Sequence, residues 1–499
     1  MQWAKVIDQT RCIGCHACST ACKSENLVPL GVNRTYVKYV DVGRFPETYR
    51  AMQVTRCNQC ERPPCATACP TAAMYRRDDG IVDFDKAACI GCKACIAACP
   101  YDAIFINPDD SGAEKCNFCA QRLDVGLEPA CVTICPAEAI LVGDLNDPAS
   151  RVAKIVGREA VSVRRPEKDT RPKLFYKGAH AATLDPLGAR RPDGGLFLWS
   201  EQGDLPHQVP SGHPGAGTSA AAALLSYDVP HRAPWDFKVS LYTWTKGIAA
   251  GVWPVAWLML FSGHAARTGP LWQWVAPLTS GVFLAATLAL LLLDLDRPSR
   301  FYLIFTRPQW QSWLVRGAVI LTAYAALLGL HLAASLLGLP GPPRALEPPG
   351  LVLAALAAVY TAYLFAQAKA RDLWQSALLP PQILVQALLA GSAALLLLAP
   401  WFEGRPVPLL AGLTGACSAI HLLLVAGETT LTHTTAHARL AVHEMTRGRY
   451  ARFFWSGVAL MAAGIAAPFW GAPAAALALL GLLAYEHAYV QSAQAVPLA

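Results

Sequence analysis

The feature that most constrains this chain is the spacing of its cysteines. Residues 89–100 read CIGCKACIAACP, with two residues between each of the first three cysteines and three before the fourth, which precedes a proline. This run is typical of chains that hold [4Fe–4S] clusters. Three closely spaced thiolates can surround three irons of one cubane, while the fourth points away and binds a neighbouring cluster. Pro100 then turns the chain, because proline cannot continue a helix.

Sixteen of the seventeen cysteines fall in four such groups, and only Cys417 stands alone. The groups are Cys12/Cys15/Cys18/Cys22, Cys57/Cys60/Cys65/Cys69, Cys89/Cys92/Cys95/Cys99 and Cys116/Cys119/Cys131/Cys135. A proline follows the last cysteine of every group except the first, where Lys23 follows. Stretches 80–84 and 103–106 are rich in β-forming residues and flank the groups. The pattern predicts an α+β ferredoxin-like iron–sulfur domain over residues 1–142.

Two other uses of cysteine compete with this interpretation. Secreted disulfide scaffolds are small and lack the repeated spacing. Zinc also binds four cysteines, but zinc ribbons present two separated C-x₂-C pairs and not one continuous run. Zinc is therefore the remaining competitor for these ligands, and iron is favoured.

The C-terminal part is apolar over long stretches. Hydrophobic residues make up 54% of the chain and charged residues 15%, and the charges and cysteines concentrate near the N-terminus. Eight stretches approach the ~20 residues that a helix needs to cross the hydrocarbon of a bilayer. They lie near 241–263, 272–293, 312–337, 351–371, 379–399, 407–427, 453–470 and 472–492. Runs such as 283–293 are apolar on every face, which excludes a soluble bundle. We expect an all-α polytopic membrane domain of about eight helices over residues 238–499.

Residues 143–237 differ from both neighbours. The sequence is mixed and basic from 144 to 177, and rich in Gly, Pro and His from 179 to 234. This composition indicates a surface connector without a core of its own.

Basic residues favour one orientation. With an even number of spans, the loops on the side of the termini carry Lys238, Arg297, Arg300, Arg307, Lys369, Arg371, Arg439, Arg447, Arg449 and Arg452, and the opposite loops carry Arg267, Arg344 and Arg405. The positive-inside rule places the iron–sulfur domain in the cytoplasm, against the inner membrane. The N-terminus shows no apolar segment of an export signal and no twin arginine, which agrees with a cytoplasmic location. We attribute the net charge of +7 to this membrane orientation, and expect no nucleic-acid partner.

Two known families resemble the two halves. The segments 57–65 (CNQCERPPC), 115–119 (KCNFC) and 131–136 (CVTICP) resemble the four-cluster subunit of molybdopterin oxidoreductases such as polysulfide, dimethyl-sulfoxide and nitrate reductases. Segments 240–251, 294–301, 360–363 and 489–497 resemble the eight-helix, quinone-binding NrfD-like membrane subunit of polysulfide reductase. The chain looks like a fusion of the two.

The first resemblance implies two nested dicluster units with exchanged ligands. Its four ligand sets are Cys12, Cys15, Cys18 with Cys135; Cys116, Cys119, Cys131 with Cys22; Cys57, Cys60, Cys65 with Cys99; and Cys89, Cys92, Cys95 with Cys69. Some relatives have a tryptophan at the position of Cys92; the cysteine here implies four complete [4Fe–4S] clusters. The resemblance also places the inner pair nearer the membrane. Relatives often face the periplasm, unlike the orientation that the charges favour.

Ionisable groups inside apolar spans are functional candidates. Lys246 and Asp294 fall at the same depth, near the inner ends of the first two spans, and Tyr360 and Tyr363 in the middle and inner half of the fourth. These four residues are the candidate quinone site. The alternative is a structural Lys246–Asp294 ion pair, or snorkelling of Lys246. Further candidates for proton access are His421, Glu428, Glu486 and His487. The histidines His433, His437 and His443 lack C-x-x-C-H, and we expect no haem.

The sequence therefore predicts an electron-transfer and membrane-anchor subunit of an oxidoreductase complex. The resemblance implies a separate molybdopterin catalytic subunit containing molybdenum or tungsten, and a membrane quinone, ubiquinone or menaquinone, as partners. The alternative is a redox-linked ion-translocating subunit, or one of the alternative complex III type, that exchanges electrons with a soluble carrier.

Overall fold

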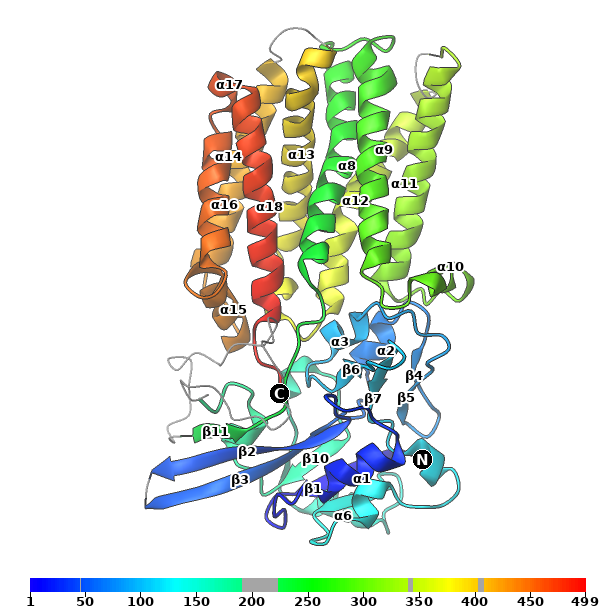
Figure 1. The fold of residues 1–499 in the computed structure, drawn as a ribbon, viewed down its shortest axis with the longest axis vertical. Helices are drawn as coiled ribbons and strands as arrows, with labels where there is room; N and C mark the ends of the chain where they lie inside the picture. The colour runs from blue at the N-terminus through cyan, green and yellow to red at the C-terminus, as the bar shows by residue number, and fades with distance from the viewer. Residues whose placement is uncertain (45, 191–222, 340–343, 403–407) are drawn as a thin grey trace.

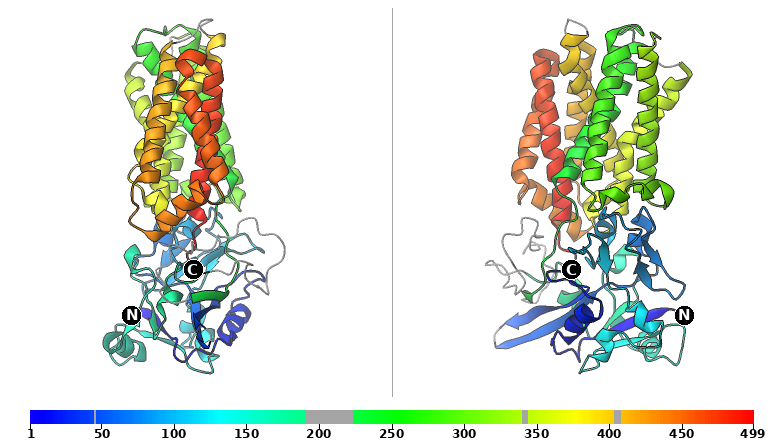
Figure 2. Two further views of the ribbon diagram at one scale, coloured as in Figure 1. Left: turned by 90° about the vertical axis from the view of Figure 1, so that its left-hand side faces the viewer. Right: turned by 45° about the vertical axis from the view of Figure 1, so that its right-hand side comes forward.

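The iron–sulfur domain lies at one end of a bundle of long helices (Figure 1). The structure is a computed structural model that describes residues 1–44, 46–190, 223–339, 344–402 and 408–499. Both chain termini lie on the side of the iron–sulfur domain, and two further views show the same division into two bodies (Figure 2).

The larger sheet of the iron–sulfur domain is built around β1 (Trp3–Asp8). Its strand order is β8-β1-β10-β9, with β10 (Leu174–Lys177) parallel to β1 and β8 (Ile140–Asp144) antiparallel to it. β9 (Val161–Ser162) pairs with β10. The predicted boundary at residue 142 thus falls inside β8, and β10 comes from the predicted connector. Both edges of β1 need hydrogen-bond partners, and the connector supplies one of them.

A second sheet is built on a long hairpin. It has the order β11-β2-β3, with β2 (Thr35–Arg44) and β3 (Glu47–Arg56) forming a hairpin and β11 (Ala223–Tyr227) pairing with β2. The connector therefore also contributes here, although its residues 191–222 lie outside the described part.

Two small hairpins accompany the inner cysteine groups. They join β4 (Met74–Arg76) with β5 (Val82–Phe84) and β6 (Ile104–Ile106) with β7 (Ala113–Lys115), which confirms the strands predicted at 80–84 and 103–106. The short helices are α1 (Ala17–Glu25), α2 (Pro64–Ala68), α3 (Ala94–Ala98), α4 (Ala120–Leu123), α5 (Ala130–Thr133), α6 (Arg151–Arg158) and α7 (Ala181–Leu184).

Helices cover all eight apolar stretches. They are α8 (Phe237–Phe261), α9 (Ala276–Leu293), α11 (Trp313–Leu336), α12 (Glu347–Gln367), α13 (Leu379–Leu398), α14 (Pro408–Thr430), α16 (Ala451–Gly464) with α17 (Ala467–Trp470), and α18 (Ala472–Gln494). Among the described residues, 6 helices are long and apolar enough to cross a membrane; α8 and α16 belong to the same bundle but are not among them. Eight crossings therefore stay a prediction. Val282 and Leu293 on α9 expose 64% and 68% of their surface, as lipid-facing residues do.

Two glycines fix how α8 meets α13. A Cβ on Gly251 would overlap the carbonyl oxygen of Ala387, and a Cβ on Gly391 would overlap the backbone of Gly251. Small residues let membrane helices approach to backbone contact. This contact brings Lys246 on α8 close to Gln386 on α13, where both line one pocket.

The two bodies are held together by charged groups. Arg297 donates to the carbonyl oxygens of Lys86 (2.5 Å) and Asp110 (2.6 Å), and Arg300 also donates to Lys86 (2.8 Å). Lys93, two residues before Cys95, lies 3.2 Å from Asp296 in the loop after α9. Some of the basic residues counted for orientation thus dock the iron–sulfur domain.

His231 binds the segment between β11 and α8 to the iron–sulfur domain. Its Nδ1 lies 2.5 Å from Asp102 of the iron–sulfur domain, and its Nε2 lies 3.2 Å from Asp228. Burial alone would lower the pKa of His231, but the two carboxylates outweigh it and raise the pKa to about 9. The imidazole is therefore charged at neutral pH and pairs with both carboxylates.

Candidate electron-transfer and quinone site

Two cavities of the iron–sulfur domain are lined by cysteines from separate groups. One is lined by Cys69, Cys89, Cys92 and Cys95, and the other by Cys12, Cys15, Cys18 and Cys135. Each has three thiols from one group and one from another, which fits the donor set of a [4Fe–4S] cluster.

The cysteines of the other two predicted sets also lie near one another. Asn26 Nδ2 is 3.7 Å from Cys22 Sγ and 3.8 Å from Cys119 Sγ, so it joins the first group to the fourth. Burial raises the pKa of Cys60, and the neighbouring Cys57 and Cys99 add to the rise. The fold therefore brings together cysteines that are far apart in the sequence.

One thiol faces two buried cations. Arg56 Nη1 lies 2.9 Å and Lys5 Nζ 3.7 Å from Cys131 Sγ. Burial raises the pKa of Cys131, but Arg56 and Lys5 outweigh it and lower the pKa to about 7. Thiolates, and not thiols, bind metals, so these cations favour the binding form.

An aromatic group leads from the cysteines to the membrane bundle. Trp235 donates from Nε1 to the carbonyl oxygen of Cys92 at 3.3 Å. Its ring stacks on Trp374 (centroids 5.6 Å apart) and lies 6.0 Å from the ring of Phe365. Phe365 lines a pocket inside the bundle. The group therefore spans the space between the Cys69/Cys89/Cys92/Cys95 cavity and that pocket.

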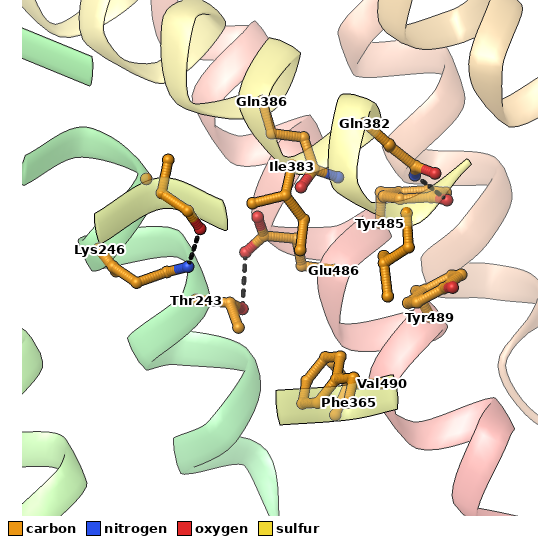
Figure 3. Close-up of a pocket in the computed structure, with 13 residues that line it drawn as sticks. Thr243, Lys246, Phe365, Gln382, Ile383, Gln386, Tyr485, Glu486, Tyr489 and Val490 are labelled. Atoms are coloured by element: carbon orange, nitrogen blue, oxygen red, sulfur yellow. Dashed lines mark hydrogen bonds between the residues drawn. The ribbon is translucent and has the colours of Figure 1, made fainter. Parts of the chain in front are cut away.

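The pocket is a narrow cleft between α8, α12, α13 and α18 (Figure 3). It is lined by Thr243, Lys246, Gly247, Ala358, Phe365, Leu379, Gln382, Ile383, Gln386, Tyr485, Glu486, Tyr489 and Val490. Seven of these thirteen residues carry a polar group on the side chain and six do not. Sites that bind small molecules usually combine apolar walls with such polar groups.

The polar groups of the pocket are held by hydrogen bonds. Lys246 Nζ donates to the carbonyl oxygen of Ala358 (2.5 Å) and to Thr361 Oγ1 (2.8 Å), and lies 5.0 Å from the centre of the Tyr360 ring. Glu486 accepts a bond from Thr243 Oγ1 at 2.9 Å (Figure 3). An amine and a carboxyl group thus face the same space from α8 and α18.

The other sequence candidates lie apart from this pocket. Asp294 is at the end of α9 beside Lys93 of the iron–sulfur domain, 3.7 Å away, and the described residues show no ion pair between it and Lys246. Tyr363 is 42% exposed and stacks on Trp313 with ring centroids 4.5 Å apart. Tyr360 is buried behind Lys246.

Several pocket residues were not singled out from the sequence. They are Thr243, Gln382, Gln386 and Tyr485. Trp235, which lies outside the pocket beside Phe365, was not singled out either. The spacing of the pocket residues in the sequence could have indicated the pocket. Gln382 and Gln386 are four residues apart in an apolar helix, and so are Tyr485 and Tyr489. That spacing places each pair on one helix face.

Comparison with known proteins identifies both halves. Residues 226–478, about half of the chain, match the family model described as "Polysulphide reductase, NrfD". The protein belongs to the NrfD polysulphide reductase family. Residues 49–145 of this NrfD protein match a model described as "4Fe-4S dicluster domain". The chain is therefore a fusion of an iron–sulfur subunit and an NrfD membrane domain.

Curated relatives match the N-terminal part of this NrfD fusion. A subunit of tetrathionate reductase from Salmonella typhimurium is 43% identical over 204 residues, 40% of this chain and 80% of the relative. A subunit of polysulfide reductase from Wolinella succinogenes is 41% identical over 177 residues, 35% of this chain and 93% of the relative. The electron transfer subunit of thiosulfate reductase from Salmonella typhi is 43% identical over 32% of this chain and 84% of the relative. The NrfD fusion is an electron-transfer subunit of an oxidoreductase complex with a multi-pass membrane domain.

Proposed function

We propose that the chain passes electrons through four [4Fe–4S] clusters between a molybdopterin catalytic subunit and a membrane quinone. The observation that carries this proposal is the Trp235 contact, which joins a cysteine-lined cavity to the polar pocket of the bundle. When bound, the clusters supply one-electron transfer. The relatives are single subunits of reductases, which supports a separate catalytic partner.

The pocket residues would orient the quinone and supply protons. Lys246 is placed to donate a hydrogen bond to one ring oxygen, and Glu486 to hold or release a proton near the other. Quinone chemistry moves two protons with two electrons, so acid–base groups within hydrogen-bond reach are required. Asp294 and Tyr363, which the sequence suggested for the quinone site, would then lie outside the pocket. Asp294 would act where the bundle contacts the iron–sulfur domain, beside Lys93.

The test begins with the complete protein in detergent, its clusters reduced with dithionite and then mixed with a soluble quinone analogue. The clusters are expected to be reoxidised, and the Trp235→Leu variant to react several-fold more slowly because the aromatic contact with Phe365 is lost. Trp235→Phe, which keeps an aromatic ring, should recover most of the rate. Trp470→Leu is the matched control, since Trp470 is 61% exposed at the far end of the bundle. Wild-type clusters that remain reduced in excess quinone contradict the proposed function.

The second proposal concerns orientation: with eight crossings, both termini and the iron–sulfur domain face the cytoplasm. Ten basic residues were counted on that side and three on the other, of which Arg405 lies outside the described residues. Arg297, Arg300 and Arg371 bond to the iron–sulfur domain or the C-terminal segment, yet the remaining excess still favours this side. A reporter fused after Ala499 should be active only in the cytoplasm. Cleavage of residues 1–142 by protease added to intact spheroplasts is the opposite result.

A further inference from the structure

A line of buried polar side chains extends from the pocket towards the face of the bundle that carries the iron–sulfur domain. Glu428, near the end of α14, is 2% exposed and accepts a hydrogen bond from Ser376 Oγ at 2.7 Å. Ser376 is half-buried, and its neighbours Gln375 and Ala377 are exposed. Glu428 is therefore one hydroxyl away from the surface of the bundle.

The other end of this line is the pocket wall. Gln382 and Tyr485 both line the pocket, and Gln382 Nε2 donates to Tyr485 Oη at 2.6 Å (Figure 3). The ring of His421 meets the ring of Tyr485 edge-on, with centroids 5.0 Å apart. His421 lies seven residues before Glu428, so two helical turns place both side chains on one face of α14.

Several polar atoms along this line have no partner within the described protein. They are Glu428 Oε1, Gln382 Oε1 and both ring nitrogens of His421, all of them buried. A buried polar atom without a hydrogen bond is costly, and internal water usually bonds to such atoms in native proteins. Carboxyl, imidazole and phenol groups spaced by water form a chain along which protons can pass.

We propose that Glu428, Tyr485, Gln382 and His421 form the proton route between the surface at Ser376 and the quinone pocket. The inference rests on the proposed quinone function and adds the path of the protons. For reduction, two electrons come from the iron–sulfur domain and two O–H bonds form at the quinone oxygens. Each proton leaves an O–H or N–H bond of the route, and Glu428 is reprotonated from water at the Ser376 surface. For quinol oxidation the same steps run in reverse.

Two buried polar groups towards the opposite end of the bundle, His331 and Glu347, do not line the pocket. His331 accepts a hydrogen bond from Trp253 at 3.0 Å, and Glu347 accepts one from Trp257 at 2.9 Å and pairs with Arg267. None of these residues lines the pocket. The geometry therefore favours the side of the iron–sulfur domain.

The experiment compares Glu428→Gln with the complete wild-type protein, using clusters reduced by dithionite and reoxidised by a soluble quinone analogue. We expect the maximal rate to fall about tenfold or more, because an acid–base group of the route is removed. The quinone concentration at half-maximal rate should stay within twofold. Small weak acids such as azide or formate, added to the buffer, should restore much of the rate by carrying protons in place of the carboxyl group. Cys417→Ala is the matched control, because Cys417 is buried on the same helix and packs against Leu389 and Ala478.

The outcomes separate the two proposals. A Glu428→Gln protein as fast as wild type overturns the route. A slow variant that weak acids do not restore, or one with weakened quinone binding, shows a structural role and also overturns it. Wild-type clusters that quinone cannot reoxidise overturn the proposed function itself.

Discussion

Replacing Lys246 with methionine is expected to reduce quinone turnover about a hundredfold, the effect of losing one positioned proton donor. Lys246 is 1% exposed and held by Ala358 and Thr361 at the pocket wall. Methionine has a similar length without the charge, so it fills the same space and removes the cost of keeping an ammonium group buried. The loss should therefore appear in quinone-dependent turnover and not in protein yield or cluster content.

Lys238→Met is the matched control for this prediction. Lys238 is another lysine of α8, two turns before Lys246, and its side chain is 38% exposed. It should retain wild-type turnover within about twofold, as surface substitutions usually do. Tyr360→Phe should lie between the two, because it keeps the ring beside Lys246 and removes the hydroxyl. Full quinone activity in both Lys246→Met and Tyr360→Phe means that the buried amine is structural.

Replacing Cys99 with alanine should remove the cluster held by Cys57, Cys60 and Cys65, and leave the cluster of its own sequence neighbours intact. The complete protein is expected to contain about sixteen iron and sixteen sulfide, and the variant about four fewer of each. The pKa of Cys60 already reflects the nearby Cys57 and Cys99. Iron and sulfide analysis with electron paramagnetic resonance of the reduced protein measures both effects.

The lone cysteine of the membrane domain supplies the control. Cys417 is buried in α14, far along the chain from the four groups, and Cys417→Ala should keep the wild-type iron content. Loss of the signal from the Cys89/Cys92/Cys95 cluster in Cys99→Ala contradicts the exchanged pairing. Stoichiometric zinc in place of iron in the wild-type protein contradicts the clusters altogether.

The local patterns predicted a large part of the molecule. Strands β5 and β6 and the helices over the apolar stretches lie where the sequence indicated, because they depend on side-chain pattern over a few residues. Strands β10 and β11 come after the predicted boundary at 142, yet they pair with strands more than a hundred residues before them. Composition alone does not report such pairing.

For the proposed quinone site, too, the sequence indicated single residues but not which of them lie together. Lys246 and Glu486 stand out in the sequence, because an ionisable group inside an apolar membrane helix is energetically costly and is usually functional. Their common pocket depends on the crossing of α8 with α13 at Gly251 and Gly391, and on the position of α18. Depth in the membrane suggested Asp294 as the partner of Lys246, but depth does not give the direction in which a side chain points.

The sequence by itself determined the cysteine groups, the family and the apolar helices, since all three depend on the types and spacing of residues that are close together in the chain. Only the tertiary structure decided which cysteines of different groups share a cavity, which polar side chains line the pocket, and that Trp235 lies between them. The physical reason is that these contacts join residues far apart in the chain. They are fixed by backbone approach and sheet pairing between elements, which short-range periodicity does not encode.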